Sequence, residues 1–159
     1  FIPNDSFETI YSLVAKENQE CVNVLHSFSS YETRKDYMST TEDNTHKYPC
    51  IYTIKNGDIP TFFYSNNNTK GHFGTPKLIW SNGRIISVGS YIDANGDYAL
   101  TQFSSGIIDT PKNLPLIKKA FDSKPFRDLM EDCAVSDMSI NRKIIATFRK
   151  DFWKEFIND

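Results

Sequence analysis

Residues 48–64 read YPCIYTIKNGDIPTFFY. Their first part, residues 48–54, is rich in aromatic and β-branched side chains, which is typical of a β-strand. Asn56-Gly57-Asp58 then predicts a tight hairpin turn, because Asn and Gly readily adopt the positive φ that such turns need. Residues 60–64 are again aromatic and predict the returning strand. A β-hairpin is therefore expected near the middle of the chain.

Short strand patterns continue on both sides of this hairpin. On the N-terminal side, residues 21–28 predict a strand, preceded by a helix that begins at Asp5 or Ser6. On the C-terminal side, apolar runs separated by turn residues predict three more strands, at residues 77–80, 85–92 and 98–103, with a continuation of the third at 106–109. Residues 93–97, Asp-Ala-Asn-Gly-Asp, predict the hairpin turn between the second and the third.

The pattern changes after Asp109, where apolar residues begin to recur at helical spacing. Three helices are predicted from this point, over residues 114–121, 125–133 and 142–157. Because the strands come first and the helices follow, the expected fold class is α+β. Its architecture would be a mixed, mainly antiparallel sheet with C-terminal helices packed on it.

The composition predicts one globular domain over residues 1–159. Hydrophobic residues make up 39% of the 159 residues and charged residues 24%, which excludes a disordered or low-complexity protein. The formal net charge of −2 argues against a uniformly basic, histone-like nucleic-acid binder. It does not exclude a local basic face, since phosphate contacts depend on where the charges lie.

Cysteine usage and hydropathy indicate the compartment. Cys21, Cys50 and Cys133 are odd in number and widely spaced, so no disulfide framework is predicted. No apolar run approaches the ~20 residues needed to cross a bilayer. We therefore expect a cytoplasmic protein with no membrane partner. The chain begins at Phe1 instead of Met, and we interpret it as an excised piece of a larger polypeptide.

A charge asymmetry is the most informative functional feature. Residues 59–92 contain no Asp or Glu, whereas acidic residues are frequent in the rest of the chain. Cations, amides and hydroxyls are the groups that phosphate oxygens and base edges require. The predicted DNA-binding residues, in or just after this window, are the phosphate-neutralising cations Lys70, Lys77 and Arg84, and the base-reading side chains Asn66, Asn67, His72, Asn82 and Gln102.

The alternative is a neutral antiparallel sheet whose acidic residues happen to lie elsewhere in the chain. Aromatic residues in the same window allow the same two interpretations, stacking on bases or packing in the core. For Trp80, which lies on an apolar strand, packing in the core is the expectation.

No catalytic or metal site is predicted from the motifs. Cys21, His26, His46 and Cys50 have suitable side chains for zinc, but their spacing fits no standard zinc motif. Residues 93–97 are similar to the start of a calcium-binding loop, yet the residues required later in such a loop are missing. The sequence has neither a phosphate-binding glycine loop nor a nucleophile elbow.

Several short motifs occur in a familiar order. They are residues 47–52 (KYPCIY), 64–66 (YSN), 71–83 (GHFGTPKLIWSNG), 91–93 (YID), 96–103 (GDYALTQF), 107–109 (IID), 114–121 and 126–129. This order resembles the C-terminal target-recognition region of restriction–modification enzymes that carry an N6-adenine methyltransferase, the TaqI-like specificity domains. The resemblance extends over residues 47–157 and rests on diffuse motifs, with no catalytic signature among them.

The resemblance implies a DNA-reading module that is not itself an enzyme. Double-stranded DNA would be its ligand. The chain would be a C-terminal fragment of a larger restriction–modification protein with or without endonuclease activity. An upstream methyltransferase domain of that protein would be its partner and would bind S-adenosylmethionine. The Asn/Asp-Pro-Pro-Tyr/Phe catalytic motif of such methyltransferases does not occur in the 159 residues. By holding the duplex in register, the module would let the catalytic domain extrude its adenine.

Two other functions remain open on the sequence. The first is a protein-docking module of a larger enzyme, which would use an aromatic surface and would have no salt-sensitive affinity for DNA. The second is an independent metal-dependent nuclease, which would need Asp93 or Asp97 for cleavage.

Overall fold

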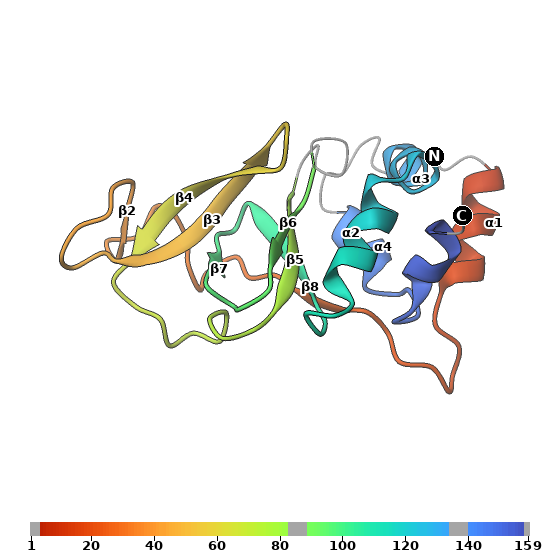
Figure 1. Cartoon of the computed structure of the whole chain (residues 1–159), viewed down its shortest axis with the longest axis horizontal. Helices are drawn as coiled ribbons and strands as arrows, with labels where there is room; N and C mark the ends of the chain where they lie inside the picture. The colour runs from red at the N-terminus through yellow and green to blue at the C-terminus, as the bar shows by residue number, and fades with distance from the viewer. Residues whose placement is uncertain (1–3, 83–88, 134–139, 158–159) are drawn as a thin grey trace.

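The structure, a computed structural model, describes residues 4–82, 89–133 and 140–157 (Figure 1). Their fold is α+β, with two mostly antiparallel sheets followed by helices, and it confirms the predicted class. The elements are α1 (Asn4–Leu13), β1 (Asn23–Leu25), β2 (Met38–Ser39), β3 (Tyr48–Lys55), β4 (Ile59–Ser65), β5 (Lys77–Ser81), β6 (Tyr91–Asp93), β7 (Ala99–Leu100), β8 (Ser104–Ile108), α2 (Leu114–Asp122), α3 (Lys124–Cys133), α4 (Ile140–Ile145) and a 3-10 helix, η2 (Phe152–Phe156).

The predicted hairpin is confirmed and forms the centre of one of the two sheets, which we call the second sheet. β3 and β4 pair antiparallel around a turn in which Gly57 has φ +86° and Asp58 has φ +60°. The strand order in this sheet is β2-β4-β3-β7, and β7 pairs with β3 in parallel. The turn therefore uses the left-handed conformations that the sequence predicts for it.

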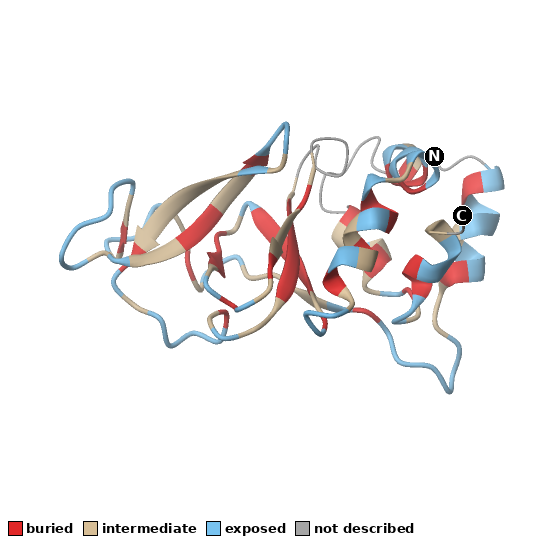
Figure 2. Cartoon of the chain, viewed as in Figure 1, coloured by how far each residue is buried: buried red, intermediate tan, exposed pale blue. Residues whose placement is uncertain are grey.

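The other sheet, which we call the first sheet, has the order β1-β8-β5-β6, and all its pairs are antiparallel. Figure 1 shows it between the β3–β4 hairpin and the helices. Side chains of β5 alternate between two cores. Leu78 and Trp80 pack with α2 and α3, whereas Ile79 packs with Ile51 and Leu100 of the second sheet. β5 is buried along most of its length because it is covered on both faces (Figure 2).

The helical core is rich in aromatic rings. Trp80 is fully buried and lies 5.4 Å from the Phe121 ring, which in turn stacks on Phe126 at 4.7 Å. The expectation that Trp80 packs in the core is therefore confirmed.

The prediction of one strand through residues 98–103 and 106–109 is wrong. The chain leaves the second sheet after Leu100 and enters the first sheet at Ser104. A turn makes this change, with Ser104 N donating to Thr101 O at 3.2 Å. For the same reason residues 93–97 do not form a hairpin, since β6 and β7 belong to different sheets.

The first four residues of the strand predicted at 85–92 lie outside the described residues, and β6 accounts for the end of that strand.

The predicted terminal helix over residues 142–157 is also wrong. α4 ends at Ile145, and the backbone then pairs with the N-terminal segment through the bridges Val14–Phe148 and Cys21–Arg149. Arg149 N, for example, donates to Leu13 O at 2.8 Å. These long-range hydrogen bonds replace the helical ones, and η2 forms only after them. The strand predicted at residues 21–28 is likewise shortened, to β1.

Candidate nucleic-acid interface

Lys77 does not reach the surface. Its side chain is fully buried, and Nζ donates to Asp93 Oδ2 at 2.7 Å, to Thr75 O at 3.0 Å and to His72 O at 3.1 Å. Burial lowers the pKa of Lys77, and the hydrogen bond to the Asp93 carboxylate opposes this effect. The prediction that Lys77 neutralises a phosphate is therefore wrong, because its charge is already compensated inside the protein.

His72 lies beside this pair and is 2% exposed. Its Nδ1 accepts a hydrogen bond from Leu100 N at 3.0 Å, which fixes the ring as a neutral acceptor on that side. Burial, and secondly the charge of Lys77, lower the pKa of His72 to about 4. The prediction that His72 reads a base edge is therefore also wrong. Its ring supports the end of β7 from within.

Asn66, Asn67 and Lys70 lie together on one surface loop, which we call the asparagine loop (residues 66–70). Its backbone is held by hydrogen bonds from Asn66 N to Tyr37 O at 3.0 Å and from Lys70 N to the Tyr31 hydroxyl at 3.2 Å. The Asn67 side chain accepts from Thr69 N at 2.8 Å, so this amide shapes the loop. Asn66 and Lys70 are exposed, and both side chains are open to a ligand.

The Lys70 ammonium lies above an aromatic ring. Its Nζ is 4.0 Å from the centroid of Tyr37 and 6.0 Å from that of Tyr31. Such a cation–π contact contributes about 0.5–1 kcal/mol at an exposed site and restricts where the ammonium points. The loop therefore presents an oriented cation next to an exposed amide.

Asn82 and Gln102 form a second group. The Asn82 Nδ2 donates to Gln102 O at 3.3 Å, and Oδ1 accepts from Ser105 Oγ at 2.6 Å. The Gln102 side chain binds both the backbone and the hydroxyl of Thr33, at 3.1 and 2.9 Å. Both amides are half-buried, and their hydrogen bonds connect the 26–33 segment to the first sheet. Arg84, the last predicted residue, lies outside the described residues.

Two cations near the asparagine loop escaped the prediction because they lie outside the acid-free window. Lys47 immediately precedes Tyr48, which pairs with Ser65, and Lys35 lies two residues before Tyr37, which binds Asn66. Both are exposed. Strand pairing is the signal that places them here, since β2, β3 and β4 are neighbours in one sheet. The same pairing also brings acidic side chains, such as Asp36, close to the loop.

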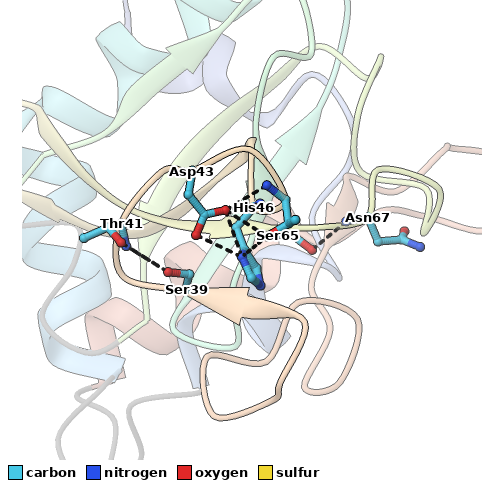
Figure 3. Close-up of polar contacts among 7 residues, drawn as sticks. Ser39, Thr41, Asp43, His46, Ser65 and Asn67 are labelled. Carbon is cyan, nitrogen blue, oxygen red and sulfur yellow. Dashed lines mark hydrogen bonds and ion pairs between the residues drawn. The ribbon is translucent and has the colours of Figure 1, made fainter.

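Figure 3 shows the adjoining end of the second sheet, where Asp43 and His46 lie near Ser39 and Ser65. Asp43 accepts hydrogen bonds from the backbone of His46 at 2.6 Å and of Thr45 at 2.9 Å, and these lower the pKa of Asp43 to about 2. His46 Nδ1 also lies 3.1 Å from the carboxylate. Among the described residues, neither of these two serine hydroxyls contacts His46. The group is therefore an Asx turn, with no arrangement for nucleophilic catalysis.

The side chains considered for metal chemistry do not form a site among the described residues. No group of three or more His, Cys, Asp and Glu in that part of the chain is arranged to hold a metal ion. Asp93 uses one oxygen for Asp97 N and the other for Tyr98 N and Lys77. The carboxylate that a nuclease would need is therefore engaged in structural contacts.

A cavity of about 440 Å³ lies away from these residues, between the N-terminal segment and η2. The cations that line it are paired with acidic side chains, Arg149 at 3.2 Å and Lys154 at 3.7 Å from Asp151 and Lys150 at 3.5 Å from Glu20, and Asp109 also lines the cavity. Because opposite charges compensate each other there, the cavity has no marked preference for an anion.

Comparison with known proteins gives no relative for this chain: no family model, no curated protein and no solved structure matches it. Within the described residues, none of the helices combines the length and the apolar character needed to span a membrane.

Proposed function

We propose that this chain is a DNA target-recognition module of a restriction–modification protein, which reads duplex sequence for an upstream N6-adenine methyltransferase domain. The asparagine loop is the observation that supports this proposal best. It presents the exposed Asn66 amide and the Lys70 ammonium on a backbone fixed by Tyr31 and Tyr37. An amide is suited to the donor and acceptor pattern of adenine, and an ammonium to a phosphate.

Preorganisation makes this loop a better DNA contact than a flexible loop with the same residues. The hydrogen bonds of Asn66 N, Asn67 N and Lys70 N already hold the backbone, so binding orders only the side chains. Less conformational entropy is then lost on binding. Lys35 and Lys47, on the neighbouring segments, add two exposed cations to Lys70, with the acidic Asp36 next to Lys35.

In this role the chain itself binds and orients the duplex. The partner domain would hold S-adenosylmethionine and the extruded adenine, which agrees with the absence of the methyltransferase motif from the 159 residues. Lys35, Lys47 and Lys70 would fix the register on the phosphates, while Asn66 would contact a base edge.

Fluorescence anisotropy on a labelled duplex across a salt series tests this proposal. The wild-type chain is compared with a Lys35→Ala, Lys47→Ala, Lys70→Ala variant. A Lys16→Ala, Lys112→Ala, Lys124→Ala variant is the matched control, because it removes the same charge from exposed positions elsewhere. If each of the three lysines meets one phosphate, the slope of log K against log salt becomes shallower by roughly 2–3 in the first variant only.

Two results would contradict the proposal. Absence of binding by the wild type at low salt would exclude a DNA-binding surface on this chain. Equal loss in both triple variants would show that binding follows net charge and does not depend on the asparagine loop.

Protein docking is the second candidate function, and one observation favours it. Phe7 and Tyr11 lie one turn apart on α1 and are 58% and 76% exposed. Paired exposed aromatics of this kind are typical of a protein contact. This function predicts that the wild-type chain has no salt-sensitive affinity for DNA by anisotropy, and that Phe7→Ser with Tyr11→Ser weakens its association with the rest of the larger enzyme by calorimetry.

A further inference from the structure

Phe28 is an exposed aromatic ring held in a fixed position. It is 66% exposed and lies three residues after the end of β1 at Leu25. The His26 ring meets it edge-on, with centroids 4.7 Å apart. The Arg142 guanidinium lies over it, 5.3 Å from the centroid. These two contacts orient the ring and still leave most of its surface free.

Arg142 carries a charge that no described residue compensates. Its Nε is buried without a hydrogen-bond partner, and none of the ion pairs among the described residues includes it. Burial, and secondly this charge, lower the pKa of His26, so His26 is neutral near pH 7 and adds no competing positive charge. A half-buried guanidinium that has no ion-pair partner among the described residues favours the approach of an anion.

The His26 ring has polar contacts at one of its two nitrogens. Its Nδ1 lies 3.1 Å from Ser105 Oγ, 3.3 Å from Ser104 O and 3.3 Å from Asn82 Nδ2. Its Nε2 is buried and has no hydrogen-bond partner in the part of the chain that the structure describes. His26 and Arg142, which both contact the Phe28 ring, thus each have a buried nitrogen without a partner among residues 4–82, 89–133 and 140–157. Buried polar groups in native proteins usually have partners.

This group is connected to the asparagine loop through Tyr37. The Tyr37 hydroxyl donates to Ser29 O at 2.7 Å, directly after Phe28, and the Tyr37 ring lies under Lys70 Nζ. A cation, two aromatic rings and a second cation thus follow one another in the order Lys70, Tyr37, Phe28, Arg142. Cations combined with exposed aromatic rings are what single-stranded nucleic acid binds, through its phosphates and its base faces.

We infer that Phe28 and Arg142 form a subsite for an unpaired nucleotide, in which the base stacks on Phe28 and its phosphate binds Arg142. The inference rests on the proposed function, and it adds a class of ligand. A base inside an intact duplex has both faces covered by its neighbours, so only an unpaired base offers a face to Phe28. Extrusion of the target adenine by a partner domain creates unpaired nucleotides at this interface.

Two oligonucleotide probes test the subsite by anisotropy: a fully paired duplex, and the same duplex with one unpaired adenine. The Phe28→Ala variant is expected to bind the bulged probe about tenfold more weakly than the wild type, and to bind the paired probe equally well. Phe7→Ala, which removes a similarly exposed ring from α1, serves as the control and should change neither affinity. Arg142→Lys keeps the charge but loses the planar group, and should weaken binding of the bulged probe less than Arg142→Ala does.

A fluorescence measurement distinguishes stacking from an effect on folding. Trp80 and Trp153 are 0% and 7% exposed, so a Phe28→Trp variant adds the one strongly exposed tryptophan among the described residues. Its emission is expected to be quenched by the bulged probe and not by the paired probe. Unchanged emission, or equal loss of affinity for both probes in Phe28→Ala, would overturn the inference while the proposed function stands. Failure of the wild type to bind either probe would overturn both.

Discussion

Lys77, His72 and Asp93 form one buried polar group at the base of the loop that connects β4 to β5. Asp93 binds the Lys77 ammonium and two backbone amides, and His72 binds the amide of Leu100. Each partner depends on the others, because an ion left alone in the interior loses its hydration without compensation. The group links the loop to β6 and β7 and so fixes the surface above it.

Asp93→Asn should therefore destabilise the protein strongly. The substitution leaves the buried Lys77 charge without a counter-ion, and we expect a loss of about 3–5 kcal/mol in the free energy of unfolding. Asp97→Asn is the matched control in the same turn, since Asp97 is exposed, and its effect should stay within about 0.5 kcal/mol. Urea unfolding of the two variants measures the difference. Equal stability of the two would contradict the structural role of the ion pair.

His72 should make stability fall in mild acid. Burial lowers the pKa of His72 to about 4 in the folded protein, from 6.5 in the unfolded chain. Between these two pH values the unfolded chain therefore binds a proton at His72 and the folded chain does not. The neutral His72 therefore makes its full contribution to the free energy of unfolding above pH 6.5, and this contribution is lost as the pH falls toward 4. From pH 7 to pH 4.5 the loss amounts to about 2 kcal/mol.

Urea unfolding of the wild type and of a His72→Asn variant at both pH values measures this contribution. The asparagine oxygen can still accept from Leu100 N but does not titrate. The variant should be less stable at pH 7 and should lose about 2 kcal/mol less on acidification. A stability difference between the two proteins that is the same at both pH values would contradict this account.

At the scale of elements, the loop before β5 and the turn after β6 are locked together at Gly96. A Cβ at Gly96 would lie 2.2 Å from Thr75 N, and Gly74 N donates to Gly96 O at 2.8 Å. The residue also has φ +70°. Both the space and the backbone conformation therefore require glycine.

Gly96→Ala should destabilise the protein more than Gly71→Ala does. Gly71 has φ +90°, but a Cβ there meets nothing within 4 Å, so this substitution carries only the conformational penalty of about 1 kcal/mol. Gly96→Ala adds a clash with backbone, and we expect a further loss of about 1–3 kcal/mol. Thermal or urea unfolding compares the two variants. A Gly71→Ala variant as unstable as Gly96→Ala would show that the close contact is unimportant.

Local patterns predicted the elements best where local interactions determine them. The β3–β4 hairpin, α2 and α3 are specified by turn residues and by apolar spacing, and all three are confirmed. The terminal helix was predicted wrongly because residues 147–150 bond to the N-terminal segment, a contact that no local pattern reveals. Residue type also identified Lys77 as a cation without revealing that Asp93 lies next to it in the neighbouring strand.

The residues of the candidate site, too, could be predicted from the sequence only where they are adjacent in the chain. Asn66, Asn67 and Lys70 could be predicted to lie together because they are adjacent in sequence. Lys35 and Lys47 could not, since strand pairing places them. The acid-free window is continuous in the sequence, but the structure distributes it between the surface and the interior.

At the scale of the whole molecule, β5 joins the two halves. Leu78 and Trp80 belong to the helical core, while Ile79 belongs to the core between the sheets. Neither core is complete without this strand. We therefore expect the β-rich and helical parts to unfold together.

Urea unfolding followed by two probes tests this cooperativity. Tryptophan fluorescence reports on the helical core, where Trp80 and Trp153 are buried, and far-ultraviolet circular dichroism reports on the backbone of the helices and both sheets together. The two curves should coincide with a single midpoint. Separate midpoints would show that the two halves are independent folding units.

Figure 1 shows the loops of the second sheet at one end of the molecule and α1 at the other. A DNA contact at the first end leaves the Phe7 and Tyr11 face of α1 open to a protein partner. The two candidate functions therefore use different surfaces, and variants can separate them.

Selection from a randomised duplex library tests the proposed target recognition most directly. The wild-type chain is incubated with the library near physiological salt, and the bound duplexes are sequenced over successive rounds. The account predicts enrichment of one short motif, and a change or loss of preference at one position of that motif in the Asn66→Ala variant. A bound pool that stays random, or one whose motif is unchanged in Asn66→Ala, would contradict base reading by the asparagine loop.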